Sequence, residues 1–251
     1  MVLKEKVAIV TGGGSGVGRV IALRFAREGA HVVVAGRTLE KVQETASEVE
    51  KIGTGSLALK TDVSISTDVS RMVEATINRF GKIDILVNNA GTIVRKTFFD
   101  FTEEDWDTVM DVNLKGVFLC CKQVVPVMMK QGKGKIINIA STSGHIGHRM
   151  CYGASKAGVI NFTATLALQL APYRINVNSI SPGIIDTSMA AALKTSPELE
   201  AKIVGCIPYG RIGRPEDTAS VALFLASDES DYMVGSDVIV DGGLINTFPS
   251  Y

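Results

Sequence analysis

The stretch KVAIVTGGGSGVGRVIALRFAREG (residues 6–29) decides the fold, because it joins an apolar run to a helical pattern through a glycine-rich turn. The run KVAIVT (6–11) is apolar on both faces, as buried strands of parallel sheets are. The turn TGGGSGVG (Thr11–Gly18) opens the helix, and a tight turn of this kind is where glycine's freedom is needed. A helix N-terminus binds anions through its free N–H groups and its dipole. This segment therefore predicts a strand–turn–helix unit that binds phosphate.

Further apolar runs alternate with helical patterns along the whole chain. The other predicted strands are HVVVAG (31–36), SLALK (56–60), IDILVN (83–88), KIINIA (135–140), RINVNSI (174–180) and DVIV (237–240). The predicted helices cover 17–29, 38–52, 66–80, 103–131, 150–171, 188–204 and 215–227. This alternation predicts a parallel sheet with helices on both faces. We expect one α/β domain over residues 1–251, a doubly wound, Rossmann-type fold with a seven-stranded parallel sheet.

Composition narrows the classes of function. The chain has 26 Lys and Arg against 26 Asp and Glu, so its formal net charge is zero. A nucleic-acid partner or an anionic membrane would call for a basic excess, and we expect neither. No run reaches the ~18 apolar residues of a membrane span, and the N-terminus does not resemble a signal peptide. Four cysteines, two of them adjacent (Cys120 and Cys121), make a poor disulfide framework. These features predict a cytoplasmic protein.

Four motifs follow predicted strands in a fixed order. They are TGGGSGVG, NNAG (Asn88–Gly91), Tyr152-x-x-x-Lys156 and SPG (Ser181–Gly183). Gly12, Gly16 and Gly18 do not have the G-x-G-x-x-G spacing of the standard dinucleotide fingerprint. Together the four motifs resemble the short-chain dehydrogenase/reductase family, including its 3-oxoacyl reductase-like members, and the likeness spans essentially the whole chain. The resemblance implies a nicotinamide cofactor and a homotetramer.

The residues after the second strand predict which nicotinamide cofactor is used. An acid there binds the ribose 2′-hydroxyl of NAD, whereas an arginine accepts the 2′-phosphate of NADP. Here AGRT (Ala35–Thr38) offers Arg37 and no carboxylate, which favours NADP(H). NAD(H) is the alternative, because Ser15 stands where many NADP-preferring relatives carry a basic residue. Motif and resemblance give these cofactor-binding candidates: Gly12, Ser15, Gly16, Val17, Gly18, Arg37, Asp62, Val63, Asn89, Tyr152, Lys156, Ile185 and Thr187.

Tyr152 and Lys156 carry the predicted chemistry. Their spacing places both on one face of a helix. A free phenol, with a pKa near 10, is a poor base at neutral pH, and a nearby ammonium lowers that pKa. Tyr152 then acts as general acid in reduction and general base in oxidation. By resemblance, Ser141 binds the developing alkoxide, with Ser143 as its competitor, and Asn113 holds a helix open and orders a water linked to the lysine.

The region around the substrate is less determined by sequence. Ser141 and Tyr152 are 11 residues apart, about two fewer than is usual in the family, so the loop His145–Cys151 is shortened. We interpret His145, His148 and Cys151 as cleft residues rather than a metal site. Arg95 and Arg149 are candidates to pair with an anionic substrate group, although exposed arginines are common on any surface. Residues 188–207 resemble the family's mobile substrate lid.

The sequence thus predicts an NADP(H)-dependent oxidoreductase that interconverts a small-molecule ketone and a secondary alcohol by hydride transfer. An alternative is an NAD(H)-dependent alcohol or hydroxysteroid-type dehydrogenase on the same fold. A non-catalytic dinucleotide-binding regulator would have a broken Tyr–Lys–Ser set, and a dehalogenase-like lyase would have lost the glycine loop. Both features are intact here.

Overall fold

The computed structural model describes residues 1–147, 149–193 and 195–247. Within them, seven strands form one sheet in the order β3-β2-β1-β4-β5-β6-β7, and every pairing is parallel. The strands are β1 (Val7–Thr11), β2 (His31–Gly36), β3 (Ser56–Lys60), β4 (Ile85–Asn88), β5 (Gly134–Ile139), β6 (Ile175–Pro182) and β7 (Asp237–Val240). This confirms the predicted seven-stranded parallel sheet. The order reverses between β1 and β4, and ligands of such sheets bind at that crevice.

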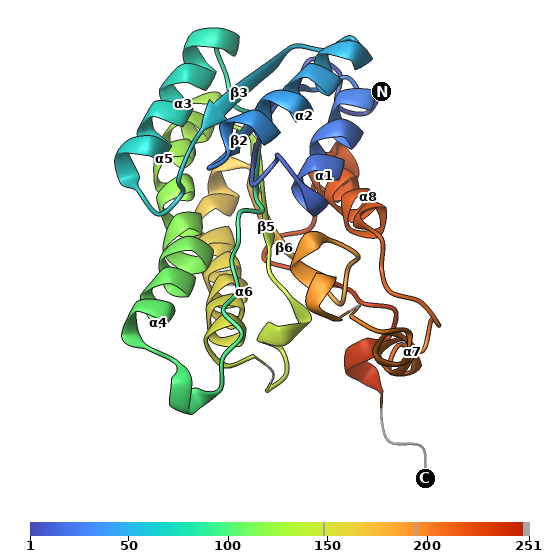
Figure 1. Cartoon of the computed structure of the whole chain (residues 1–251). Helices are drawn as coiled ribbons and strands as arrows, with labels where there is room; N and C mark the ends of the chain where they lie inside the picture. Colours follow the sequence, from blue (N-terminus) through green and yellow to red (C-terminus); the bar gives the residue numbers. More distant parts are fainter. Residues whose placement is uncertain (148, 194, 248–251) are drawn as a thin grey trace.

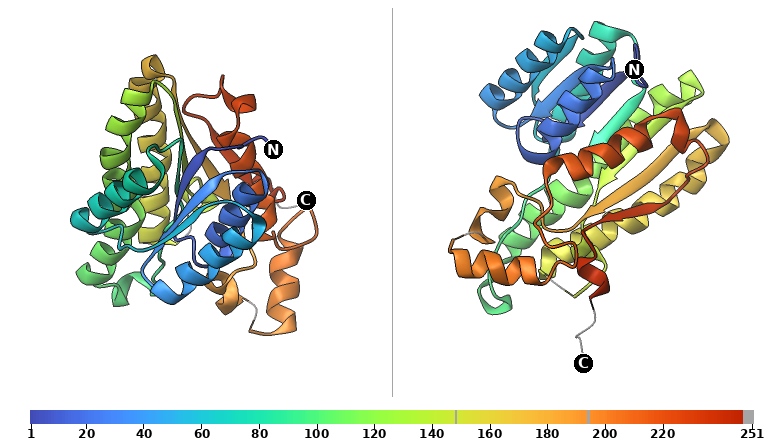
Figure 2. Two further views of the ribbon diagram at one scale, coloured as in Figure 1. Left: turned by 90° about the horizontal axis from the view of Figure 1, so that it is seen from above. Right: turned by 90° about the vertical axis from the view of Figure 1, so that its right-hand side faces the viewer.

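Helices cover both faces of the sheet (Figures 1 and 2). One layer comprises α1 (Gly16–Arg27), α2 (Leu39–Ile52) and α8 (Pro215–Ala226), and the other comprises α3 (Ser66–Phe80), α5 (Gly116–Gln131) and α6 (Met150–Leu170). Each layer of helices packs against one face of the sheet and buries its own apolar cluster there. Alternate residues of β1 divide between them, with Val10 in the first cluster and Ile9 in the second. The strand is apolar throughout because both of its faces are buried.

The predicted helical stretch 103–131 is confirmed and contains a π turn, whereas the predicted helix 188–204 is wrong in detail. Residues 103–131 form α4 (Glu103–Met110), a π-helical turn (Asp111–Lys115) and α5, rather than one α-helix. Residues 188–204 are also divided, into a 3₁₀ segment (Ser188–Leu193) and α7 (Pro197–Gly205). Ser196 caps α7 by accepting a hydrogen bond from the N–H of Leu199, and Pro197 takes the first turn. Proline there is compatible with a helix start but not with a helix interior, which explains the break.

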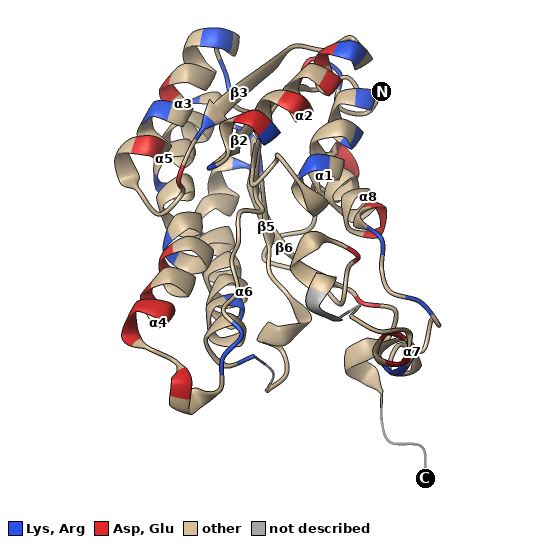
Figure 3. Cartoon of the chain, viewed as in Figure 1, with Lys and Arg blue, Asp and Glu red and all other residues tan. Residues whose placement is uncertain are grey.

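The helical stretch Glu103–Gln131 is long and apolar enough to cross a membrane by length and composition alone. In the folded chain it is a core element instead. Val117, Cys120, Val124 and Met128 are buried in the second apolar cluster. The charged residues lie mainly on the surrounding helices and loops (Figure 3), and three acids form the first turn of α4. Acids at that end stabilise a helix through its dipole.

Candidate active site

The loops after β1, β4, β5 and β6 meet at one end of the sheet around a cavity of about 550 Å³. The predicted site residues that line it are Gly12, Ser15, Gly16, Val17, Asn89, Ser141, Tyr152, Lys156, Ile185 and Thr187. Residues 188–190 and Ile203, from the predicted lid, also line it. Ser143, the alternative serine, lines the same cavity. Residues from the first to the last third of the chain therefore converge here.

The glycine loop is held by close backbone contacts. A Cβ on Gly18 would lie 2.4 Å from the carbonyl oxygen of Gly12 and 2.3 Å from Nδ2 of Asn89, so any side chain there forces the loop apart. Asn89 donates from Nδ2 to the carbonyl oxygens of Thr11 and Gly12 at 3.0 and 3.2 Å. Ser15 starts α1 without a side-chain cap. Ser15 and the first residues of α1, Gly16 and Val17, line the cavity, and the free N–H groups of a helix start can donate to an anion there.

A second cavity, of about 170 Å³, adjoins the glycine loop. It is lined by Arg37, Asp62 and Val63. These are three of the five predicted residues that the larger cavity does not reach, the other two being Gly18 and Asn113. Lys41, in the first turn of α2, lines it as well and was missed by the sequence reasoning. Its position four residues after Arg37 was the available signal. Two cationic side chains therefore stand at this end of the site.

Lys156 is almost wholly buried on α6, with 4% of its surface exposed. Its Nζ donates a hydrogen bond of 2.7 Å to the carbonyl oxygen of Ile139, at the end of β5. The same Nζ lies 5.8 Å from the centroid of the Tyr152 ring, so the expected pairing on one helix face is present. Burial lowers the pKa of Lys156 to about 8, because a desolvated ammonium is costly.

Tyr152 is partly buried, and burial raises the pKa of its phenol. The Ser141 hydroxyl, through a hydrogen bond, and the charges of Arg149 and Arg95 act in the opposite direction. This contact favours Ser141 over Ser143 as the serine next to the phenol. The N–H of Ser143 instead donates to Oγ of Ser141 at 3.1 Å and fixes that hydroxyl. A Cβ on Gly144 would lie 2.8 Å from the backbone nitrogen of Ala157, so glycine lets this loop approach α6 closely.

Asn113 lies behind the cavity, fully buried in the π-helical turn. Its Oδ1 accepts from the N–H of Thr92 at 2.8 Å, and its Nδ2 donates to the carbonyl oxygen of Thr92 at 2.9 Å. Nδ2 also donates to Oγ of Ser155 at 3.1 Å. The side chain thus ties the loop after β4 to α6, beside Lys156. The resemblance predicted a residue that opens a helix at this position, and π turns often occur at functional sites.

Of the predicted cleft residues, His145 and Cys151 are described by the structure, and they have different partners. Nε2 of His145 lies 2.7 Å from Oδ2 of Asp237, whereas Sγ of Cys151 lies 3.7 Å from the carbonyl oxygen of Trp106. His148 lies outside the described residues. Cys120 and Cys121 are buried, and burial raises the pKa of both thiols, that of Cys121 to about 12. Among the described residues, no three His, Cys, Asp or Glu side chains are grouped to hold a metal.

The fold and this cavity define an α/β oxidoreductase with a doubly wound sheet. A family model described as enoyl-(acyl carrier protein) reductase matches residues 12–245. The 3-oxoacyl-[acyl-carrier-protein] reductase of Thermotoga maritima is 41% identical over 98% of this chain and 100% of its own length. The Staphylococcus aureus enzyme of the same name is 40% identical over 95% and 98%. The chain therefore belongs to the short-chain dehydrogenase/reductase family, and its oxidoreductase chemistry concerns ketones and alcohols.

Solved structures agree with this assignment. Levodione reductase superposes with a TM-score of 0.94 at 32% identity, covering 98% of this chain and 100% of its own. A short-chain type dehydrogenase/reductase from Mycobacterium marinum superposes with a TM-score of 0.91 at 38% identity, covering 96% of each chain. The superposition therefore extends over nearly the whole of each chain and not over the sheet alone.

Proposed function

We propose that the protein is an NADP(H)-dependent oxidoreductase that interconverts a ketone and a secondary alcohol, with Tyr152 as the general acid and base. The observation that carries this proposal is the single cavity shared by the glycine loop, Ser141, Tyr152 and Lys156. The glycine loop and the start of α1 hold the pyrophosphate, and the nicotinamide supplies or accepts the hydride when bound. In reduction the Tyr152 hydroxyl gives its proton to the carbonyl oxygen, and in oxidation the phenolate takes the alcohol proton back.

The neighbouring side chains prepare Tyr152 for this transfer. The Ser141 hydroxyl donates to the substrate oxygen as negative charge develops there, and the N–H of Ser143 keeps Oγ of Ser141 in place. The Lys156 ammonium favours the phenolate electrostatically. Asn113 is a positioning residue, because it touches Thr92 and Ser155 rather than the cavity. Of the remaining cofactor candidates, Asn89, Ile185 and Thr187 line the path between the glycine loop and Tyr152.

The preference for NADP(H) rests on the smaller cavity. Arg37 and Lys41 both line it, and together they favour a phosphate on the adenosine ribose. Asp62 lines the same cavity with Val63, and we assign both to the adenine. The alternative is NAD(H), as in an alcohol or hydroxysteroid-type dehydrogenase.

A fluorescence titration of the purified protein with NADPH and with NADH tests the assignment. We expect tighter binding of NADPH, and in Arg37→Asp a reversal toward NADH, because a carboxylate repels the 2′-phosphate. Lys122→Asp is the control, because it also replaces a cation by a carboxylate but at an exposed position on α5. It should leave the ratio of the two affinities unchanged. Tighter NADH binding by the wild type would support the NAD(H) alternative. Binding of neither nucleotide by the folded protein would refute the dehydrogenase proposal altogether.

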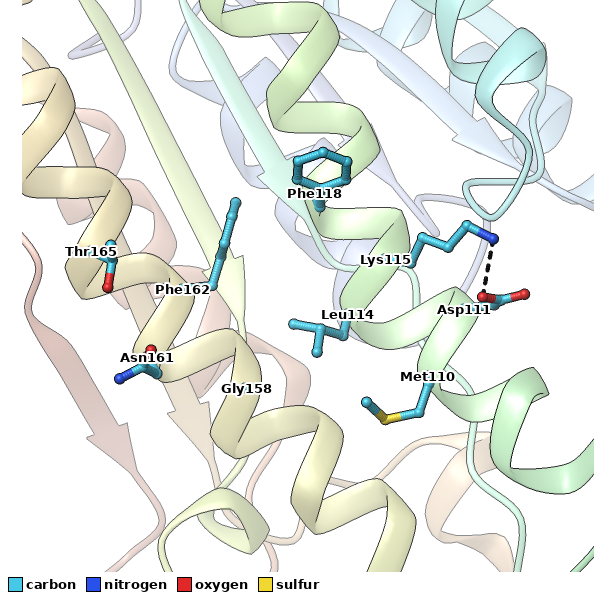
Figure 4. Close-up of a pocket in the computed structure, with 9 residues that line it drawn as sticks. All are labelled: Met110, Asp111, Leu114, Lys115, Phe118, Gly158, Asn161, Phe162 and Thr165. Atoms are coloured by element: carbon cyan, nitrogen blue, oxygen red, sulfur yellow. Dashed lines mark hydrogen bonds and ion pairs between the residues drawn. The ribbon is translucent and has the colours of Figure 1, made fainter. Parts of the chain in front are cut away.

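We also propose that the chain forms a homo-oligomer, a tetramer by resemblance. A groove of about 460 Å³ runs between α5 and α6 on the outside of the molecule. Met110, Leu114, Phe118 and Phe162 give it an apolar lining, and Lys115 pairs with Asp111 at its edge (Figure 4). Exposed apolar surface of this kind marks interfaces. Light scattering should give a mass above one chain, and Phe118→Glu should reduce it. A wild-type monomer would contradict this proposal.

Two further proposals concern organisation and location. We propose that residues 1–251 act as one domain, with residues 188–207 as the lid over the substrate. Within the described residues, Met189, Ala190 and Ile203 of this segment reach the cavity. We place the protein in the cytoplasm, because its four cysteines are free and reducing compartments keep thiols in that state.

A further inference from the structure

The cavity around Tyr152 has a strongly one-sided charge. Among the described residues that line it, Arg95, Arg149 and Lys156 are cationic, and none is an aspartate or glutamate. Lys156 is buried beneath the phenol and is already bonded to Ile139. The two arginines come from different loops, one after β4 and one at the start of α6. Two separate loops thus bring guanidinium groups to the substrate side of the cavity.

Both guanidinium groups act on the reacting phenol. Burial and the charge of Arg95 lower the pKa of Arg149. The charges of Arg149 and Arg95 in turn lower the pKa of Tyr152, against the effect of its burial. The geometric basis is that all three residues line the same cavity. Within the described part of the chain, neither arginine forms an ion pair with a carboxylate, and the guanidinium of Arg95 donates only to the carbonyl oxygen of Met189, at 2.5 Å.

Arg95 is exposed and Arg149 is partly buried, so both guanidinium groups are accessible to an anion that enters the cavity. Two like charges repel, and Arg149 also bears a desolvation cost. Arg149 has a left-handed backbone, with φ of 58°, at the cap of α6, which fixes where its side chain starts. A guanidinium group presents five donors and binds a carboxylate through two parallel hydrogen bonds. The bond of Arg95 to Met189 leaves its other donors for a ligand.

We propose that the substrate is an oxo acid, a ketone that bears its own carboxylate, and that Arg149 and Arg95 bind this carboxylate. The proposal rests on the proposed function, because the same ligand places its carbonyl oxygen at Tyr152 and Ser141. In the reduction, the carbonyl carbon takes the hydride from the nicotinamide and the carbonyl oxygen takes the Tyr152 proton. The product is the hydroxy acid, and the carboxylate is unchanged. A 3-oxoacyl thioester has no carboxylate next to its reacting ketone, and its anionic phosphate lies at the far end of the carrier arm.

A matched pair of ketones tests the proposal. The probes are 4-oxopentanoate and its methyl ester, which share a carbon skeleton and differ in the charge. The measurement is kcat/KM for each with the reduced nucleotide. Because hydrogen bonds to charged groups are the stronger kind, we expect the wild type to favour the acid about tenfold or more. In Arg149→Asn most of this ratio should disappear, and Arg149→Lys should recover part of it. Asparagine is chosen because it tolerates positive φ.

Arg174→Asn is the matched control. Arg174 also has a positive φ, of 56°, but it is exposed at the start of β6 and does not line the cavity. This variant should keep both the activity and the acid-to-ester ratio of the wild type. A wild-type preference for the ester or for a 3-oxoacyl thioester would overturn the proposal. An acid-to-ester ratio that is unchanged in Arg149→Asn would overturn it too.

A binding measurement separates this proposal from the proposed function. If neither ketone is reduced, calorimetric titration of the protein with its oxidised nucleotide, using pentanoate and pentanamide as probes, still decides the point. Binding of pentanoate that is lost in Arg149→Asn but retained in Arg174→Asn supports the carboxylate site, even if the ketone chemistry is wrong. Equal binding of the acid and the amide, or no binding of either, overturns the site.

Discussion

The buried charge of Lys156 should be measurable as a pH-dependent cost to stability. The pKa of Lys156 in the folded protein is about 8, against an ordinary value of 10.5. Below pH 8 the lysine is charged in both states, and each pH unit between the two pKa values is worth about 1.4 kcal/mol. Keeping the ammonium buried therefore costs about 3 kcal/mol at neutral pH. This cost is relieved as the pH rises from about 8 to 10.5, because the folded protein releases its proton first.

The perturbation is Lys156→Met, which keeps an unbranched side chain one atom shorter and removes the titrating group. Urea unfolding followed by circular dichroism at pH 7 and pH 9.5 gives the free energy of unfolding of each variant. We expect the stability of Lys156→Met relative to the wild type to fall by about 2 kcal/mol over this range. Taking the difference removes the opposing effect of the buried thiols. Burial raises the pKa of Cys120 and Cys121, so the folded protein loses stability in both variants as the pH passes about 9.

The control and the refuting result are simple. Lys122→Met removes an exposed lysine from α5, and its stability should follow the wild type at both pH values. The contradicting result is a difference in the free energy of unfolding between Lys156→Met and the wild type that changes by less than about 0.5 kcal/mol from pH 7 to pH 9.5. In that case Lys156 does not carry a buried charge. The lowered pKa, and with it the electrostatic role proposed for this lysine, would then be wrong.

Two further changes test the site. Tyr152→Phe should retain NADPH affinity in the fluorescence titration and lose about 10²–10⁴-fold in kcat, because the ring stays and the transferable proton is removed; a variant with wild-type kcat would eliminate Tyr152 as the acid. Gly18→Ala should weaken nucleotide binding at least about tenfold, since its Cβ would lie 2.4 Å from the Gly12 carbonyl oxygen. Gly205→Ala is its control, because nothing lies within 4 Å of a Cβ there and its φ is not positive. Equal nucleotide affinities in the two alanine variants would contradict the loop argument.

The sheet was predictable because its signal is local. The runs HVVVAG and SLALK became β2 and β3 with the predicted bounds, since short runs of this length between turn residues favour strands over helices. The glycine loop was predictable for a similar reason, because each glycine reports a local backbone requirement. The Tyr152 and Lys156 pair needed only helical spacing. In each case, the information lay within about ten residues of sequence.

The remaining features depend on contacts between distant segments. The π turn at Asn113 does not interrupt the apolar periodicity of residues 103–131, and its hydrogen-bond partner, Thr92, lies 21 residues away. The acceptor for Lys156, the carbonyl oxygen of Ile139, is a backbone group without any signature in sequence. The break before α7 is different, because Ser196 and Pro197 formed a readable helix start that the apolar pattern of residues 188–204 concealed. Tertiary contacts, unlike caps, leave no local pattern.

The charges around Tyr152 suggest why two kinds of cation are gathered there. Burial raises the pKa of the phenol and lowers that of Lys156, so the pocket opposes the charged form of both. A lysine with a pKa of about 8 loses its charge on the alkaline side of neutrality, whereas guanidinium groups remain charged. Arg149 and Arg95 therefore keep a positive potential at the phenol where Lys156 no longer can. The arginines thus have two linked effects, attraction of an anionic substrate and support of the phenolate, and a carboxylate that binds to them partly cancels the second.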